Sequence, residues 1–493
     1  MGNGIIEKVM LIRPSNTMPK DSILRLTTPL SLLYLGGVLR NSGYDVNILD
    51  SSCEGYYNRT FEGSDVTYGL SDQDVVKRIR EYEPDIVGVT AMFSSQQNMA
   101  LHYCGLVKSA RDVPVVMGGL HSSLFPQETL KNPSVDYVVL GEGEYKLLNL
   151  IESLNKGKTE FEFDGIAYIE NGENLKVNPS TSKIQDLNAL PLPARDLIDM
   201  ERYIQVGLPM GPFTRRERVE QVMTSRGCPF FCNFCSAADY FGHKLRTRSV
   251  DNVMNEIEEL ITKYQIQEIQ FSDDNLTANK KKAKELFRRM KPYNLSWCTP
   301  NGIMVKTLDE EMIRLMAESG AYQITFAIES GSERVLREIM HKEVPSREKV
   351  KKLVDLCQEY KIQTHATFIV GLPGEKKEEI YSTLQYPFDI NFNSASFFIA
   401  SPLPGSKLRE ECKRKGYLTE DRKFNVKSAE IIIPPNSPDY VMPKEELVEL
   451  VDKKTREFNN FSKQKDPHAW DLKFEQFIKK YKGNDDVIHG RVT

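Results

Sequence analysis

The chain has 493 residues, of which 40% are hydrophobic and 27% charged, an ordinary composition for a globular protein of two or three domains. Its 65 basic and 69 acidic residues leave a net charge of −4, so nothing indicates a nucleic-acid partner, and no apolar run approaches the ~20 residues of a membrane span. The start lacks the apolar segment of a signal peptide and the eight cysteines do not suggest a disulfide framework, so we expect a cytoplasmic protein.

Residues 5–150 alternate short apolar runs with helical stretches. Strands are predicted at 9–12, 46–49, 85–90, 113–117 and 137–140, and helices at 29–40, 72–82 and 97–110. This alternation predicts an α/β fold, a Rossmann-like parallel sheet with helices on both faces. Ligands of such sheets bind beyond the carboxyl ends of the strands. Those ends carry Ser15, Asn16, Gly118, Gly119, His121, Gly141 and Glu142.

Residues 151–213 contain short strands and a proline-rich connector, which predicts a linker.

A second alternating pattern then covers residues 214–415. Six strands are predicted at 220–224, 268–271, 296–300, 323–327, 364–370 and 395–400, with helices at 250–264, 280–290, 308–319, 348–360 and 376–385. Six such units predict a partial (β/α)6 barrel with functional groups at the carboxyl ends of its strands. Residues 416–493 hold an apolar run at 431–435 and helices near 444–461 and 470–479, which predicts a helical cap over the barrel mouth.

Three cysteines, Cys228, Cys232 and Cys235, follow the first predicted barrel strand with the spacing C-x3-C-x2-C. A four-iron cluster normally takes four thiolates, so three close ligands leave one iron open to bind a small molecule. The alternative is a structural zinc site, which needs a fourth ligand. The nearest is His243, eight residues beyond the third cysteine.

The cysteine loop, with Phe234 before its third cysteine, resembles that of the radical S-adenosylmethionine (SAM) superfamily. The resemblance implies a [4Fe-4S] cluster whose open iron chelates SAM and whose electron releases a 5'-deoxyadenosyl radical. It also implies roles for polar and glycine-rich strand ends. Asp273 and Asp274 would hold the methionine ammonium, although one of them could instead cap a helix. Glu329 and Ser330 would hold the methionine end and the ribose, with Gly371, Gly374 and Phe234 near the adenine.

The first third resembles the cobalamin-binding domain that precedes many radical SAM domains. The resemblance rests on Thr28-Pro29-Leu30, on Gly118-Gly119-Leu120-His121 and on Gly141-Glu142-Gly143-Glu144. The Asp-x-His-x-x-Gly motif, whose histidine replaces the lower cobalt ligand, is absent, so this ligand is left unassigned. His121 would line the corrin pocket or only cap its loop, and a domain that has lost its corrin stays an alternative.

Several other polar residues are less informative. His365 lies in a predicted strand and reaches either the substrate or a core partner. Cys298 is either a hydrogen-atom donor or, as we favour, a buried bystander. Arg215, Arg216 and Arg218 form a short basic run that either solvates a loop or meets the phosphate tail of the corrin.

The combined resemblance implies a cobalamin-dependent radical SAM enzyme. In the favoured interpretation, the radical abstracts hydrogen from an unactivated carbon and methylcobalamin supplies the methyl group. The alternative is an enzyme of the anaerobic magnesium-protoporphyrin monomethyl ester cyclase type, without methyl transfer.

Two other interpretations are disfavoured. A methylthiotransferase would need three further cysteines in the first domain, where only Cys53 and Cys104 occur, and a regulatory corrin sensor would leave the cysteine triplet unexplained. The substrate (a small molecule, lipid, tetrapyrrole or peptide) is not specified, and the chemistry implies a flavodoxin or ferredoxin as electron donor.

Overall fold

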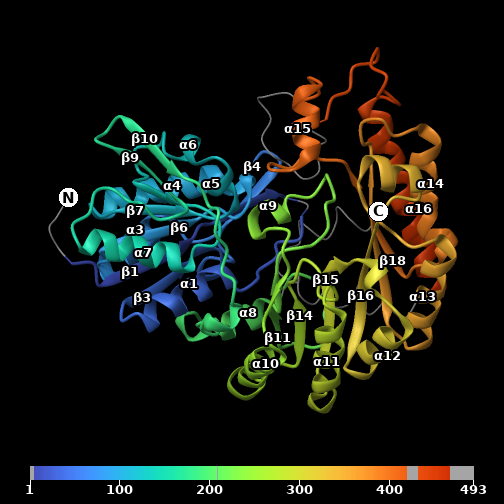
Figure 1. The fold of residues 1–493 in the computed structure, drawn as a ribbon, viewed down its shortest axis with the longest axis horizontal. Helices are drawn as coiled ribbons and strands as arrows, with labels where there is room; N and C mark the ends of the chain where they lie inside the picture. The colour runs from blue at the N-terminus through green and yellow to red at the C-terminus, as the bar shows by residue number, and fades with distance from the viewer. Residues whose placement is uncertain (1–4, 21, 208, 212, 419–430, 467–493) are drawn as a thin grey trace. The chain divides into compact units, whose positions relative to one another are not determined.

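The computed structural model describes residues 5–20, 22–207, 209–211, 213–418 and 431–466 (Figure 1). The chain forms two compact units, and the described part of unit 1 ends at residue 207 and that of unit 2 at residue 466. Each unit is built on its own α/β sheet. Our finer division of the chain at residues 151, 214 and 416 stays a prediction.

Unit 1 contains a seven-stranded sheet in the order β10-β9-β8-β7-β6-β1-β3. Its parallel strands are β1 (Lys8–Arg13), β3 (Asp45–Asp50), β6 (Ile86–Thr90), β7 (Val115–Gly118) and β8 (Tyr137–Val139). All five were predicted from their apolar runs. The antiparallel hairpin of β9 (Ile166–Glu170) and β10 (Asn174–Asn178) extends this sheet beyond β8.

Helices cover both faces of this sheet, as the alternating pattern predicts. One face packs against α3 (Asp72–Tyr82) and α4 (Gln97–Ala110), whose buried residues include Val75, Ile79 and Val107. The other face packs against α1 (Leu30–Asn41) and α7 (Glu144–Asn155). The two apolar cores hold the sheet rigid and leave the loops at its carboxyl end free for polar residues.

A small antiparallel sheet of unit 1 was not predicted. It consists of β2 (Asn16–Pro19), β4 (Arg59–Glu62) and β5 (Asp65–Tyr68), in the order β2-β5-β4. The segment carries short, mostly polar strands, so no apolar periodicity marks it in the sequence. The short helices α2 (Ser51–Glu54), α5 (Leu120–Leu124), α6 (Pro126–Thr129) and α8 (Met200–Val206) complete the helices described in unit 1.

Unit 2 contains six parallel strands in the order β11-β14-β15-β16-β17-β18. Their bounds are Val219–Val222, Glu268–Phe271, Ser296–Ile303, Ala321–Glu329, Gln363–Val370 and Ser394–Ile399. Because β11 and β18 are not paired to each other, the barrel is partial, as predicted. A two-stranded ladder of β12 (Ser225–Arg226) and β13 (Arg246–Thr247) closes the long loop after β11.

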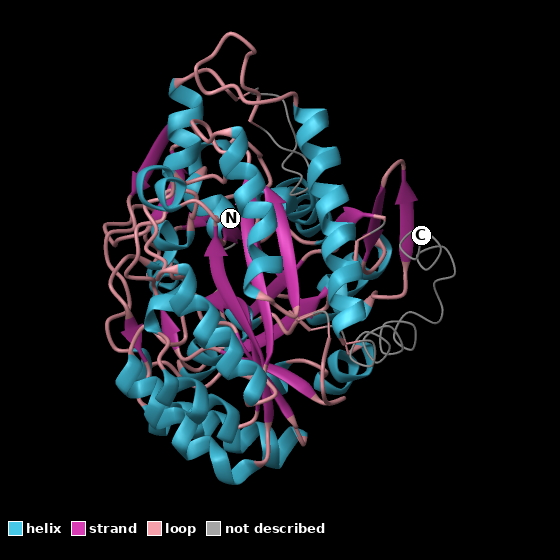
Figure 2. Ribbon diagram, turned by 90° about the vertical axis from the view of Figure 1, so that its right-hand side faces the viewer, coloured by secondary structure: helices cyan, strands magenta, loops and turns pink. Residues whose placement is uncertain are grey.

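Helices lie on the outer side of these strands, and Figure 2 shows the strands running inside the helical layer. They are α10 (Val250–Tyr264), α11 (Lys280–Met290), α12 (Glu310–Glu318), α13 (Arg347–Glu359), α14 (Lys377–Ile390) and α16 (Lys444–Lys465). The first four begin at side-chain caps, Ser249, Asn279, Asp309 and Ser346, which accept from the free amides of the first turn. The remaining α-helices described in unit 2 are α9 (Ala237–Phe241) and α15 (Lys407–Arg414), and a π-helix covers Val335–Ile339.

The carboxyl-terminal segment packs onto the last barrel strands. Leu447 and Val451 of α16 bury against Val370 of β17 and Ile380 of α14. The predicted run 431–435 forms only a bridge, between Leu418 and Ile431. The helix predicted near 470–479 lies outside the described residues. No helix in the described ranges combines the length and the apolar character needed to cross a membrane.

Candidate functional site

The three motif cysteines lie on the loop between β12 and α9, after the first barrel strand. All three thiols are free; Cys228 and Cys232 are half-buried and Cys235 is exposed. Burial raises the pKa of Cys228 to about 11, and neighbouring Asp274 acts in the same direction. Burial also raises the pKa of Cys232. A bound metal ion would stabilise the thiolate forms of these residues, as it does for other cysteine ligands.

The loop does not form a zinc knuckle. His243, the nearest further ligand type, stacks on Phe231 with ring centroids 4.0 Å apart, and its Nδ1 lies 3.2 Å from the carbonyl oxygen of Phe230. Among the described residues, no three histidine, cysteine or acidic side chains form a group that could hold a single metal ion. Each thiolate of a four-iron cluster binds a different iron, so three free cysteines on one loop fit such a cluster better than one zinc ion.

Asn233 ties the cysteine loop to the rest of unit 2. Its amide donates to the carbonyl of Met340 at 3.1 Å, its side chain donates to the carbonyl of Ile339, and its own carbonyl accepts from Leu408 at 2.9 Å. The residue is buried, so these bonds are shielded from water. The loop is thereby fixed to the segment after β16 and to α15.

The two adjacent acids at the end of β14 differ in their surroundings. The buried carboxylate of Asp273 accepts from the amide and hydroxyl of Thr224 and from the hydroxyl of Ser225, at 3.0, 2.6 and 2.5 Å. Asp274 has no hydrogen-bond partner among the described residues, and burial together with Asp273 raises its pKa to about 6. Asp273 therefore connects two strand ends, whereas Asp274 is available to a cationic ligand near the cysteines.

Glu329 ends β16 in the left-handed region, with φ of 73°. The register between β16 and β17 shifts between Ala327 and Glu329, so a bulge directs this carboxylate. It accepts from the hydroxyl of Thr367 at 3.2 Å and lies 3.6 Å from the ammonium of Lys342. Burial raises the pKa of Glu329, and Lys342 opposes that rise.

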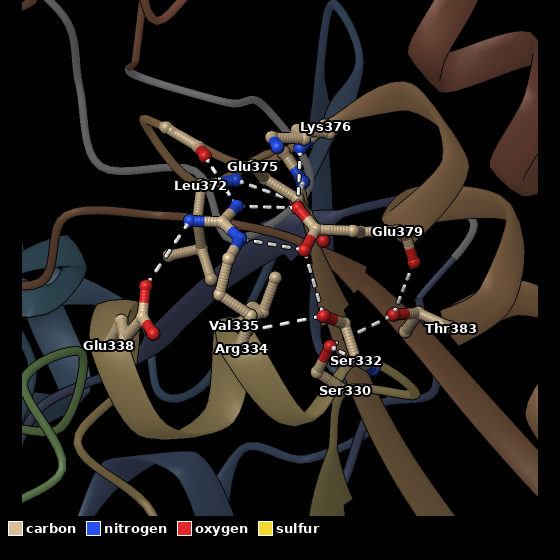
Figure 3. Close-up of polar contacts among 12 residues, drawn as sticks. Ser330, Ser332, Arg334, Val335, Glu338, Leu372, Glu375, Lys376, Glu379 and Thr383 are labelled. Carbon is tan, nitrogen blue, oxygen red and sulfur yellow. Dashed lines mark hydrogen bonds and ion pairs between the residues drawn. The ribbon is translucent and has the colours of Figure 1, made fainter.

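A polar network joins the loop after β16 to the loop after β17 (Figure 3). Arg334 donates from Nε and Nη2 to both carboxylate oxygens of Glu379, at 2.8 and 2.5 Å, and to the carbonyl of Gly374 at 2.8 Å. The hydroxyl of Ser332 donates to the same carboxylate at 2.9 Å. Ser330 is fully buried and its hydroxyl pairs with that of Thr383 at 3.0 Å, so it holds the loop in place.

The loop after β17 is held together by a buried acidic residue, Glu375. Oε2 of Glu375 accepts from the amides of Gly371 and Leu372, at 2.7 and 3.1 Å, while Oε1 has no partner among the described residues. Burial raises the pKa of Glu375 to about 8, so the group is mostly protonated at neutral pH. Gly371 and Gly374 both have positive φ, and Phe234 packs against the apolar cluster that includes Val335 and Met340.

In unit 1, two residues predicted to meet the corrin use their side chains internally. The hydroxyl of Ser15 is buried and pairs with Ser51 and Tyr103 at 2.9 and 2.7 Å. The amide of Asn16 donates to the hydroxyl of Tyr68 at 3.0 Å. Both therefore help to shape the carboxyl end of β1.

The loop after β7 is built around Gly119, which has φ of 110°. A Cβ atom there would lie 2.5 Å from the carbonyl oxygen of Ala91, so only glycine fits. The next turn buries His121, whose Nδ1 lies 3.0 Å from the hydroxyl of Ser94. Its Nε2 has no partner among the described residues, and burial lowers its pKa, so the ring is neutral. An unsatisfied buried nitrogen at a strand end fits a polar ligand group.

The remaining predicted corrin residues follow the neighbouring strands. Gly118 is the last residue of β7 and has an ordinary backbone. Gly141 has φ of 71° and its amide donates to the hydroxyl of Ser123 at 2.8 Å. Glu142 is buried and accepts from the amide of Ile184 at 2.9 Å. These residues gather with His121 at the carboxyl end of the same sheet, as predicted.

Four residues with open roles have internal partners. His365 lies between the hydroxyls of Ser394 and Ser396, at 2.8 and 3.2 Å. Cys298 is buried close to Tyr322 and Glu268, and burial raises its pKa. The amides of Arg215 and Arg216 donate to the carboxylate of Glu268, at 2.6 and 2.9 Å, so their backbone closes the amino end of the barrel.

Sequence reasoning missed Lys342, Asn233, Arg334 and Glu379. Each is a common surface residue type, and no spacing marks it as functional. Arg334 and Glu379 are 45 residues apart in sequence, so only the packing of β16 and β17 brings them together. The residues before Lys342 show no apolar periodicity, so the sequence gives no signal that this lysine is buried.

Two family models match the chain. The radical SAM superfamily matches residues 222–386, and the B12-binding domain matches residues 21–151. The first match includes the cysteine loop and the ends of the unit 2 strands from β11 to β17. The second includes the loops that carry Gly119, His121 and Gly141.

Named relatives cover most of the chain. A cytidylyl-2-hydroxyethylphosphonate methyltransferase of Streptomyces wedmorensis is 38% identical over 92% of this chain and 90% of its own length. An uncharacterized methyltransferase of Pyrococcus horikoshii is 34% identical over 82% of this chain and 83% of its own length. The anaerobic magnesium-protoporphyrin IX monomethyl ester cyclase of Rubrivivax gelatinosus is 27% identical over 92% of this chain and 77% of its own.

Solved structures share the fold. The radical SAM methyltransferase TsrM from Kitasatospora setae, with a tryptophan substrate and a SAM analogue bound, has a TM-score of 0.67 at 18% identity, over 83% of this chain and 77% of its own. The cobalamin-dependent radical SAM enzyme OxsB, with aqua-cobalamin and SAM bound, has a TM-score of 0.69 at 16% identity, over 91% of this chain and 66% of its own.

Proposed function

The chain belongs to the radical SAM superfamily and carries a B12-binding domain ahead of the radical domain, and from this premise we propose that it is a cobalamin-dependent C-methyltransferase. When bound, the [4Fe-4S] cluster and SAM supply a radical that removes hydrogen from an unactivated carbon, and cobalamin supplies the methyl group. The chain's own residues hold these cofactors, position them and set the charges around them.

Unit 2 has the ligands for the first two cofactors. Cys228, Cys232 and Cys235 hold the cluster, and the open fourth position is left for SAM. We assign the methionine ammonium to Asp274, since this carboxylate has no protein partner in the described chain and lies near the cysteines. Glu329 lies at the carboxyl end of β16, while Asp273 and Ser330 position the loops through their internal hydrogen bonds.

The loops after β16 and β17 would bind the adenosine end of SAM. We propose that the backbone of Gly371 and Gly374 contacts the adenine, with Phe234 beside it. The positive φ of both glycines lets the chain approach a planar ring closely. The Arg334–Glu379 pair holds this loop against the loop that carries Ser330 (Figure 3).

Unit 1 has the residues for cobalamin. Gly118, Gly119, Gly141 and the backbone of Ser15, Asn16 and Glu142 form the carboxyl end of the sheet. The unpartnered Nε2 of His121 supports a ligand at this position. Because the imidazole is neutral and Ser94 satisfies Nδ1, Nε2 can accept or donate one further hydrogen bond.

The observation that carries methyl transfer is the 38% identity to a methyltransferase over nearly the full length of both chains. The cyclase, our alternative from the sequence, is the more distant relative at 27%.

We further propose a polar substrate. The face of β17 and β18 opposite α14 carries His365, Ser394 and Ser396, which would suit hydroxyl or phosphonate groups better than a lipid or tetrapyrrole.

The test begins with anaerobic reconstitution using iron, sulfide and hydroxocobalamin. Expected results are about four irons per chain and a retained corrin absorption band. Assays with methyl-labelled SAM then use cytidylylated 2-hydroxyethylphosphonate as the first substrate, followed by other polar alcohols. Label in the product supports methyl transfer, whereas a changed product without label supports the cyclase type.

We propose that the protein acts in the cytoplasm and that a flavodoxin or ferredoxin is its electron donor. A chemical reductant replaces this donor in the assay.

A further inference from the structure

A buried cation lies beside the cysteine loop. Lys342 is 6% exposed, and its ammonium lies 5.9 Å from the ring centroid of Phe234, a residue of this loop. A lysine is rarely buried without a specific partner, because its charge must leave water. The one ion pair of Lys342 within the described ranges is to Glu329 at 3.6 Å, longer than a direct hydrogen bond.

The backbone before Lys342 is irregular, and this irregular path positions the lysine side chain. Residues Val335–Ile339 form a π-helix, a rare form that frequently occurs at functional sites. His341 then adopts the left-handed region with φ of 51°, and the amide of Lys342 donates back to Leu336 at 2.8 Å. Asn233 binds the carbonyls of Ile339 and Met340, so this segment and the cysteine loop hold each other.

The charges that act on Cys232 come from three elements. Glu329 ends β16, Lys342 lies in the segment that follows this strand, and Lys306 follows β15; all three act on Cys232 electrostatically. Lys306 lies 4.6 Å from the ring centroid of Phe230 but is 35% exposed and paired with Glu343 at 2.6 Å. Solvent therefore screens Lys306, whereas water is excluded from Lys342 and Glu329.

We propose that the buried Lys342–Glu329 pair sets the reduction potential of the cluster held by Cys232, with Lys342 raising the potential and Glu329 lowering it. The inference rests on the proposed function, because it requires the cluster. Cluster potentials depend on nearby charge and on solvent exposure, and reduction adds one negative charge that a buried cation stabilises. Lys342 thereby eases the entry of the electron that the radical reaction needs.

The test is an EPR-monitored redox titration of the reconstituted full chain without SAM. Lys342→Met should make reduction at least about tenfold less favourable, which is a shift of ~59 mV to more negative potential. Glu329→Gln should shift the potential in the opposite direction, and Lys342→Arg should stay near the wild type. Lys306→Met is the matched control, because it removes a more exposed cation that also lies beside the cysteine loop, and it should shift the potential less than Lys342→Met.

Opposite shifts in Lys342→Met and Glu329→Gln, each with about four irons, would support the inference. An unchanged potential in both would overturn it, even if SAM binding weakened, because the pair would then act on SAM alone. If Lys342→Met does not fold, Glu329→Gln and Lys342→Arg decide the question. A wild-type chain that binds no iron would overturn the proposed function and this inference together, whereas a cluster without retained corrin would affect only the former.

Discussion

Asp273 and Asp274 are adjacent in sequence, yet among the described residues only the carboxylate of Asp273 accepts hydrogen bonds from other parts of the chain. Its carboxylate accepts from Thr224 and Ser225, while Asp274 keeps no partner in the described ranges and has a pKa raised to about 6. We expect Asp273→Asn to cost ~1–3 kcal/mol of stability, because the new amide faces hydroxyl donors. Asp274→Asn should preserve stability and weaken SAM binding at least tenfold.

Thermal unfolding of the two variants and equilibrium binding of SAM to the reconstituted protein measure these effects. The two substitutions change the same atoms one residue apart, so each controls for the other. Equal loss of SAM affinity with equal stability would contradict the assigned division of roles. Iron content should stay about four in both, since neither residue is a cluster ligand.

The pKa of Asp274 also predicts a pH dependence of SAM binding. A cationic ammonium requires the ionised carboxylate, so affinity should rise as the pH increases through about 6 and level off above it. Below this value affinity should fall toward tenfold per pH unit. Asp274→Asn should remove the dependence between pH 5 and 7, and a wild-type affinity that is flat over this interval would exclude Asp274 as the ammonium partner.

The parallel sheets and the cysteine loop could be predicted because they depend on local signals. Apolar runs and their alternation marked β14, α10 and α11 at the bounds that the structure has. The roles of Asp273 and Asp274 could not be separated, because their difference comes from Thr224 and Ser225 on another strand. The burial of Lys342 likewise depends on the bulge at Glu329 and on packing against Phe234, which no sequence period records.

The pair of Arg334 and Glu379 should control SAM affinity without touching the cluster. The pKa of Glu379 is lowered to about 2, with Arg334 as the main cause. Arg334→Met should release the carbonyl of Gly374 and weaken SAM binding about fivefold to tenfold, which corresponds to ~1–1.4 kcal/mol. Arg334 is 32% exposed, so the loss of stability should stay near ~1 kcal/mol.

Acid titration provides a second measurement on this pair. Because the folded pKa of Glu379 is below its unfolded value, its stabilisation is present above pH 4.5 and is lost as the pH falls toward 2. Glu379→Gln should therefore be less stable than the wild type at pH 7, and the difference should shrink in acid. The exposed pair Arg347–Asp389 is a matched control, and Arg347→Met should leave SAM binding unchanged.

Gly118 and Gly119 offer a matched test of the corrin site in unit 1. A Cβ atom at Gly119 would meet the Ala91 carbonyl at 2.5 Å and would require φ of 110°, whereas at Gly118 the nearest atom is 3.8 Å away. Gly119→Ala should cost more than ~1 kcal/mol and displace the turn that holds His121, because L-residues disfavour positive φ. We expect loss of the retained corrin band in Gly119→Ala and a smaller decrease in Gly118→Ala, with about four irons in both. Equal corrin retention by the two variants would place the cobalamin away from the loop after β7, since only one of them distorts it.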